Sequence, residues 1–166
     1  QQLSAGSRDA ALSAALGDPM YAIDRGAAIS IVRLEMQLSP YALIGKKNYS
    51  KIEELKGKTL MVDGPKGITK IYVERMLAPH GVKPGEFDMV FAGATSARAS
   101  ALQGGAVDAA ILLPPFNFRA VAAGFNEIGL TVDYAPELPF SGTTVNRNWA
   151  LKNGPVLQRI LAAHLK

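Results

Sequence analysis

A glycine-rich turn, Gly64-Pro65-Lys66-Gly67, contains the residue types that point most directly to chemistry. It follows a short apolar and β-branched run, Thr59 to Asp63, and precedes the helical spacing of Ile68 to Leu77. Glycines let the backbone approach a ligand, and the free N–H groups of a helix start can bind an anionic or polar group. The pattern therefore predicts a ligand site at this helix start. A tight connection between strand and helix is the alternative reading.

Signals for catalysis or metal binding are sparse. The chain has no cysteine, which excludes a disulfide, a thiol nucleophile and a cysteine metal site. His80 lies between Pro79 and Gly81, where a capping or solvated imidazole is expected, and His164 near the C-terminus has the same interpretation. No nucleophile elbow, zinc-protease motif or phosphate loop is present. We expect no enzyme, no bound metal and no cofactor.

Four charged residues have structural interpretations. Glu53 and Glu54 adjoin in sequence and therefore point in different directions, as on a solvated face. Asp108 follows two glycines at the beginning of an apolar run, where its carboxylate is expected to accept backbone N–H groups. Arg98 falls in the first turn of an expected helix, so we expect a salt bridge or solvent contact, with a ligand contact as the alternative.

Composition describes a globular chain. Of its 166 residues, 48% are hydrophobic and 19% are charged, and no apolar run approaches the ~20 residues of a membrane span. The net charge is +4, but lysine and arginine are scattered without interleaved aromatic residues. This pattern argues against a nucleic-acid partner and weakly favours an anionic small ligand.

Strands and helices alternate downstream of the turn. The expected elements are a strand at 87–91, a helix at 96–103, a strand at 107–113, a helix at 116–123 and a strand at 128–131. Such alternation predicts an α/β fold with a mainly parallel sheet covered by helices.

The chain upstream of the turn has a different rhythm. A short amphipathic helix is expected from Ser7 to Leu16, and Gly17-Asp18-Pro19 then opens a second helix. The β-branched run at 28–34 is expected to be a central strand. Residues 34–45 alternate with period two around Pro40, which favours an extended crossing connection over an interior strand.

The last part of the chain breaks the alternation again. Pro136 and Pro139 indicate a stiff linker, followed by a strand at 142–147 and a helix at 156–165. Because the rhythm changes at both ends of the central region, we expect the strands at 28–34 and 142–147 to form a sheet separate from that of 59–131.

Three strings carry a family likeness: KIEELKGKTLMVDGPKG, VERMLAPHGVKPGEFDMVFAG and ARASALQGGAVDAAILLPPFNFRAVAAGF. They resemble the second lobe of bacterial periplasmic solute-binding proteins of ABC importers. The branch of closest resemblance includes the binders of nitrate, alkanesulfonates, taurine and thiamine-pyrimidine precursors. The resemblance covers residues 37–149 and implies a two-lobed type II periplasmic-binding-protein fold.

Relative to that family, lobe two is nearly complete and lobe one is partial. The resemblance implies a partial lobe one at 1–38, lobe two at 39–136, and a strand and helix at 137–166 that return to lobe one. Because family members are nearly twice as long, we expect a fragment. Too few residues separate the Ser7 helix from Asp18 to form the usual strand, so a break or join is expected near Ala15-Leu16-Gly17.

The resemblance also implies a site between strand-end loops. Backbone N–H groups at 67–69 would bind the anionic or polar head, while Phe116 or Met20 would pack against an apolar tail. The candidate ligand-binding residues are Asp18, Pro19, Met20, Gln37, Ser39, Gly64, Lys66, Gly67, Ile68, Thr69, Pro114, Pro115 and Phe116. Capture would occur by closure of a cleft, with the solute contacting both lobes only in the closed state.

The implied function is the solute-binding component of an ABC importer for a sulfonate, nitrate, carboxylate or pyrimidine precursor. The implied partners are that solute and the membrane permease, and the implied protein is monomeric and periplasmic, or lipid-anchored outside the cytoplasmic membrane. A pyrimidine-synthase-like enzyme of the same fold and the effector-binding domain of a transcription regulator are the alternatives.

Overall fold

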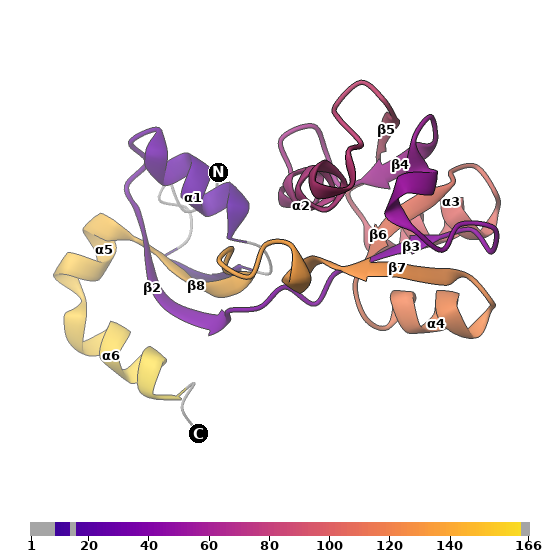
Figure 1. The fold of residues 1–166 in the computed structure, drawn as a ribbon. Helices are drawn as coiled ribbons and strands as arrows, with labels where there is room; N and C mark the ends of the chain where they lie inside the picture. Colours follow the sequence, from indigo (N-terminus) through magenta and orange to yellow (C-terminus); the bar gives the residue numbers. More distant parts are fainter. Residues whose placement is uncertain (1–8, 14–15, 164–166) are drawn as a thin grey trace. The chain divides into compact units, whose positions relative to one another are not determined.

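The computed structural model describes residues 9–13 and 16–163, which divide into two compact units. Unit 1 is drawn from residues 1–37 and 139–166, and unit 2 comprises residues 38–138. Each unit has its own sheet (Figure 1). The prediction that the strands near 28–34 and 142–147 form a separate sheet is therefore confirmed.

Unit 2 is an α/β unit. Its elements are β3 (Ala42–Gly45), η1 (Ile52–Leu55), β4 (Thr59–Val62), α2 (Ile68–Leu77), η2 (Ala78–His80), β5 (Asp88–Phe91), α3 (Thr95–Gln103), β6 (Ala109–Leu112), α4 (Phe116–Ala122), β7 (Asn126–Leu130) and η3 (Thr131–Asp133). The strand order is β5-β4-β6-β3-β7, with β4 parallel to β5 and β6, and β3 antiparallel to β6 and β7. Four strands thus share one direction and β3 is reversed, which confirms the predicted fold class.

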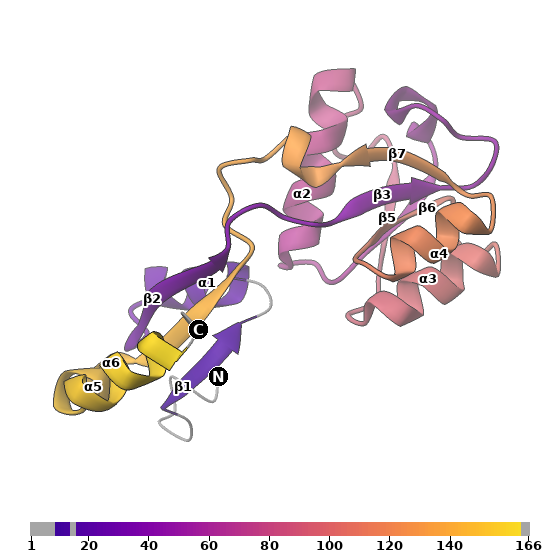
Figure 2. The same cartoon turned by 90° about the horizontal axis from the view of Figure 1, so that it is seen from below.

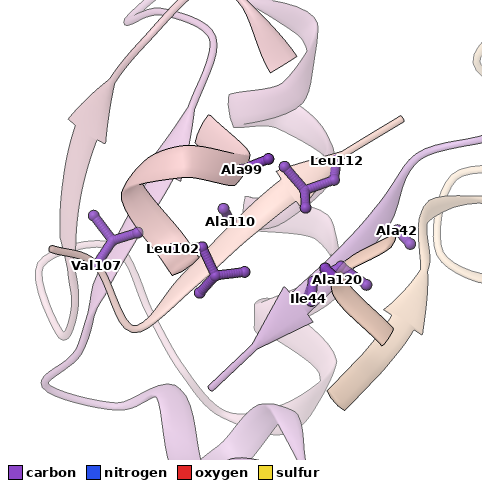
Figure 3. Packing of buried hydrophobic residues seen from close by; sticks show 8 residues of the cluster. All are labelled: Ala42, Ile44, Ala99, Leu102, Val107, Ala110, Leu112 and Ala120. Atoms are coloured by element: carbon purple, nitrogen blue, oxygen red, sulfur yellow. The ribbon is translucent and has the colours of Figure 1, made fainter. Parts of the chain in front are cut away.

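Helices cover both faces of this sheet (Figure 2). One face carries a buried cluster of Ala42, Ile44, Ala99, Leu102, Val107, Ala110, Leu112 and Ala120, contributed by β3, β6, α3, α4 and the loop before β6 (Figure 3). Leu43 faces the other way because side chains alternate along a strand. Its cross-strand partner Gly129 lies against Met76 of α2. The sheet is therefore a middle layer, with α3 and α4 on one side and α2 on the other.

The prediction that residues 34–45 form only a crossing connection is wrong. Ala42–Gly45 forms β3, a fully buried strand between β6 and β7. Pro40 precedes this strand, so its missing N–H does not interrupt the hydrogen bonds to either neighbour. The apolar residues after Pro40 can therefore occupy the interior of the sheet.

Unit 1 is built on a small antiparallel sheet. Its elements are β1 (Ala10–Ser13), α1 (Gly17–Asp24), β2 (Ile29–Met36), β8 (Ser141–Asn146), α5 (Arg147–Lys152) and α6 (Gly154–Ala163), and the strand order is β1-β8-β2. The expected helix from Ser7 to Leu16 is wrong where it can be seen, because β1 pairs with β8 from Ala10↔Val145 to Ser13↔Gly142. A partner strand so distant in sequence overrides the local helical pattern. The break expected near Ala15 involves residues 14–15, and His164 is in the C-terminal segment; both lie outside the described residues.

Candidate functional site

Polar side chains gather at one edge of the sheet in unit 2. Asp63 follows β4, Thr95 begins α3 shortly after β5 and Thr131 follows β7, while Tyr41 precedes the reversed strand β3. Since β3 runs against the other strands, its beginning lies at the edge where they end. In open α/β sheets this carboxyl edge is where ligands bind.

Arg98 organises the backbone at this edge. Its side chain is fully buried, and its guanidinium donates hydrogen bonds to the carbonyl oxygens of Ile111 (2.8 Å), Ala92 (2.8 Å) and Gly93 (2.9 Å) and to the hydroxyl of Thr95 (2.9 Å). It forms no ion pair within the part of the chain that the structure describes. The expectation of a salt bridge or solvent contact for Arg98 is therefore wrong. Carbonyl oxygens from two strand ends satisfy the buried guanidinium instead.

Hydroxyl groups fill the edge around β3. The Thr131 hydroxyl oxygen lies 2.9 Å from the Ser39 hydroxyl and 3.0 Å from the carbonyl oxygen of Tyr41, so its one hydrogen can be donated to either. The Tyr41 ring packs against Tyr72 of α2, with ring centroids 6.1 Å apart. Burial raises the pKa of Tyr41, although the charge of Arg98 opposes that rise, so Tyr41 is a neutral hydroxyl at physiological pH. Ser39, a predicted site residue, thus belongs to a buried hydrogen-bonded group.

The turn after β4 carries the predicted site at the start of α2. The N-cap residue of α2 is Gly67, which has no side chain to cap the helix, and Lys66 is exposed. The Thr69 hydroxyl is not free for a ligand: it donates to Oδ1 of Asp63 (2.6 Å) and accepts from the Asp63 N–H (2.8 Å). The protein's own packing also requires glycine at position 67, because a methyl group there would collide with the Asp63 carboxylate.

The remaining predicted residues fall into two groups. Pro114, Pro115 and Phe116 follow β6, and therefore lie at the same edge of unit 2, with both prolines exposed. Gly64 and Ile68 are part of the turn and of the first turn of α2. Asp18, Pro19 and Met20 belong to α1, and Gln37 ends the first segment of unit 1. Those four residues are therefore in the other unit, and their part in binding stays a prediction.

Three residues of the carboxyl edge were not predicted as a site. Tyr41 was interpreted as part of a crossing segment, and Asp63 as the end of a strand. Asp63 did have one signal, because it is the only acidic residue next to the glycine-rich turn. For Arg98, burial depends on the packing of α3 against β6, which no local pattern shows.

Asp108 confirms its predicted structural role at the opposite edge. Its Oδ2 accepts from the Thr59 N–H (3.1 Å), and its Oδ1 accepts from Nζ of Lys46 (2.9 Å). Burial alone would raise the pKa of Asp108, but the Thr59 N–H and the Lys46 ammonium outweigh it and hold that pKa below its usual value. The carboxylate thereby joins the starts of β4 and β6 to the end of β3.

His80 is partly exposed, and its imidazole has two side-chain partners that the expectation of a capping or solvated imidazole did not include. Its Nδ1 lies 2.6 Å from Oε1 of Glu53 and its Nε2 lies 3.0 Å from the Tyr134 hydroxyl. The hydrogen bond from His80 lowers the pKa of Glu53. Glu54 accepts the backbone N–H groups of Ser50 and Lys51, which caps η1. The adjoining glutamates therefore have specific partners rather than forming only a solvated face.

Residues 9–13 and 16–163 offer neither a metal cluster nor a helix that could span a membrane. In those residues, no three histidine, cysteine, aspartate or glutamate side chains are grouped so that they could hold a metal ion. None of the helices described there has both the length and the apolar character needed to cross a membrane.

Comparison with known proteins identifies relatives. The family model described as NMT1/THI5 like matches residues 1–164. No curated protein matches the chain.

Solved structures share the fold. The periplasmic aliphatic sulphonate binding protein SsuA from Escherichia coli superposes with a TM-score of 0.79 and 22% identity, over 97% of this chain and 55% of that chain. The alkanesulfonate-binding protein SsuA from Xanthomonas axonopodis pv. citri, solved with bound MOPS, superposes with a TM-score of 0.80 and 19% identity, over 97% of this chain and 55% of that chain. The desulfurization enzyme DSZB superposes with a TM-score of 0.65 and 13% identity, over 92% of this chain and 60% of that chain. The chain thus spans about half the length of the two SsuA structures.

Proposed function

Because the chain belongs to the NMT1/THI5-like family, we propose that it is the solute-binding component of an ABC importer. Its cargo is a small anionic or polar organic molecule, such as a sulfonate, a carboxylate, nitrate or a pyrimidine precursor. The two SsuA proteins with the same fold are named for sulfonate binding, which supports this class of solute. A periplasmic location and a membrane permease as partner are part of the same proposal.

The observation that carries the proposal is the polar edge of unit 2. A fully buried guanidinium, a buried tyrosine and a partly exposed carboxylate meet where four parallel strands end. Arg98 fixes the loops after β5 and the end of β6, so the backbone there is preorganised before a solute arrives. Phe116 at the start of α4 follows the two prolines, is partly exposed and packs against the buried cluster beside β6. Rigid polar groups at such an edge suit a small polar or anionic solute.

An enzymatic function has less support. The DSZB enzyme is similar in fold, but its TM-score is lower than those of the sulfonate-binding proteins. The histidine that the structure describes, His80, is engaged with Glu53 and Tyr134 rather than placed among the polar groups of the carboxyl edge. A regulator's effector-binding domain would share the architecture, and no residue described favours it.

Calorimetry tests this function. The purified protein is titrated with nitrate, ethanesulfonate, 2-aminoethanesulfonate, acetate, glycine, 2-methylpyrimidine and 4-amino-2-methylpyrimidine. We expect one-to-one binding of at least one compound, with a dissociation constant in the micromolar range or below, and recovery of the compound chemically unchanged. Tyr41→Phe should weaken that binding, whereas Asp88→Asn, at the start of β5, should not. Binding of none of these compounds would refute the proposed function, and conversion of the bound compound would favour an enzyme.

A further inference from the structure

The start of α2 already holds an anion that belongs to the protein. Oδ1 of Asp63 accepts the hydroxyl hydrogen of Thr69 at 2.6 Å, and Thr69 is fully buried. The carboxylate lies against Gly67, in the space that a side chain at that position would fill. The bare N-terminal turn of α2 is therefore paired with a fixed carboxylate rather than left open.

This arrangement reverses the electrostatic preference of the helix start. The partial positive charge at a helix N-terminus favours one negative group, and Asp63 supplies it. A second anion at the same turn would stand within a few ångströms of the carboxylate, where like charges repel strongly in a partly dehydrated site. Among the residues described, no cation forms an ion pair with Asp63 that would offset that repulsion.

One oxygen of the carboxylate remains available. Within the described parts of the chain, Oδ2 of Asp63 accepts no hydrogen bond, and the side chain is partly exposed. Asp63 follows β4 and therefore lies at the same edge of the sheet as the cluster around β3, whose strand begins there. An ionised carboxylate is an acceptor only, so its natural partner is a group that donates hydrogen bonds.

We infer that Asp63 determines the specificity of this edge, and that it selects a solute carrying a hydrogen-bond-donating nitrogen: an ammonium, an amidinium or an amino group on a ring. The inference rests on the proposed function and narrows it. Any anionic group of the solute would then be held away from α2, and the nitrogen would face Oδ2 of Asp63.

Matched pairs of compounds test the inference. Each pair differs by one amino group: ethanesulfonate and 2-aminoethanesulfonate, acetate and glycine, 2-methylpyrimidine and 4-amino-2-methylpyrimidine. Calorimetry at pH 7 compares the wild-type protein, Asp63→Asn and the control Asp88→Asn, an exposed aspartate at the amino end of β5 without a side-chain partner among the described residues. For the pair that binds, we expect the amino compound to bind at least about tenfold more tightly, as expected for a hydrogen bond to a charged group.

In Asp63→Asn that ratio should fall to about threefold or less, with tighter binding of the donor-free anion, while Asp88→Asn keeps the wild-type ratio. A merely structural role for Asp63 would lower the melting temperature and leave the ratio unchanged. If Asp63→Asn does not fold, Asp63→Ser retains an acceptor for Thr69 and must show the same fall. Equal wild-type affinity for both members of the binding pair, or a ratio that survives loss of the carboxylate, would overturn the inference and leave the proposed function intact. Binding of no compound would overturn both.

Discussion

Replacing Asp108 by asparagine should destabilise unit 2 at neutral pH. Asparagine keeps an acceptor for the Thr59 N–H but loses the charge that faces Lys46, whose Nζ lies 2.9 Å from Oδ1. The two side chains are 22% and 30% exposed, so solvent screens the pair only in part. Hydrogen bonds to charged groups contribute ~1.5–3 kcal/mol to stability, and exposed ion pairs contribute less than ~1 kcal/mol. The expected loss in the free energy of unfolding is therefore about 1–2 kcal/mol.

The pH dependence gives this prediction a definite sign. The pKa of Asp108 is lower in the folded protein than its ordinary value of ~3.9, so the folded state favours the ionised form. Its stabilisation is complete above the unfolded pKa and is lost as pH falls through the folded pKa. The difference between wild type and Asp108→Asn should therefore be full at pH 7 and should shrink progressively below about pH 4.

Urea unfolding followed by circular dichroism at pH 7 and pH 3 measures that difference. Hydrogen exchange over β4 and β6 shows whether the loss lies in unit 2. Asp88→Asn is a matched control, because Asp88 pairs with Thr59 across the β4–β5 ladder but its side chain is exposed. An equal loss at both pH values would show that the charge of Asp108 contributes nothing, and an equal loss in the control would show a general effect of removing acidic residues.

Three further perturbations have expected outcomes. Gly67→Ala should cost about 1–3 kcal/mol in urea unfolding through overpacking against Asp63, and Asp63→Ala in the same chain should recover most of it; purely additive losses would contradict that contact. Arg98→Met should cost about 3 kcal/mol or more by the same measurement, since it leaves buried carbonyl oxygens unsatisfied, and a loss below about 1 would contradict it. His80→Ala should raise the pKa of Glu53 toward its ordinary value in an NMR titration, so that Glu53 takes up its proton at higher pH; an unchanged titration would show that His80 is not the cause.

The contact between Gly67 and Asp63 also limits what one substitution can report. A bulky residue at Gly67 would collide with the carboxylate whether or not a solute is bound. Lost affinity in such a variant therefore would not by itself identify the turn as the binding site. Asp63 is the more informative position, because asparagine removes its charge and keeps its size.

Elements whose evidence is local could be predicted from sequence. The strand at 59–62, the helix at 68–77 and the alternation after them depend on hydrophobic period and on glycine and proline at the ends. The strand at 10–13 could not, because its partner β8 is more than a hundred residues away in sequence. The strand at 42–45 was not predicted because Pro40 was interpreted as an interruption of a strand. Pro40 in fact precedes the strand, where its missing N–H breaks no hydrogen bond of the sheet.

The site divides in the same way. A glycine-rich helix start is visible in sequence, and in the structure a side chain closely approaches the backbone of Gly67 in the turn after β4. What approaches is the protein's own Asp63, and that depends on how the turn folds back over α2. The burial of Arg98 likewise depends on two strand ends, those of β5 and β6, meeting in space, which no spacing along the chain expresses.

The hydrogen bonds between Thr131 and the residues at Ser39 and Tyr41 join the two ends of unit 2 to each other. Although these ends are some ninety residues apart in sequence, the chain enters and leaves unit 2 at neighbouring points, as an inserted domain does in its host. Cutting the chain at these two points therefore breaks no strand pair of its five-stranded sheet.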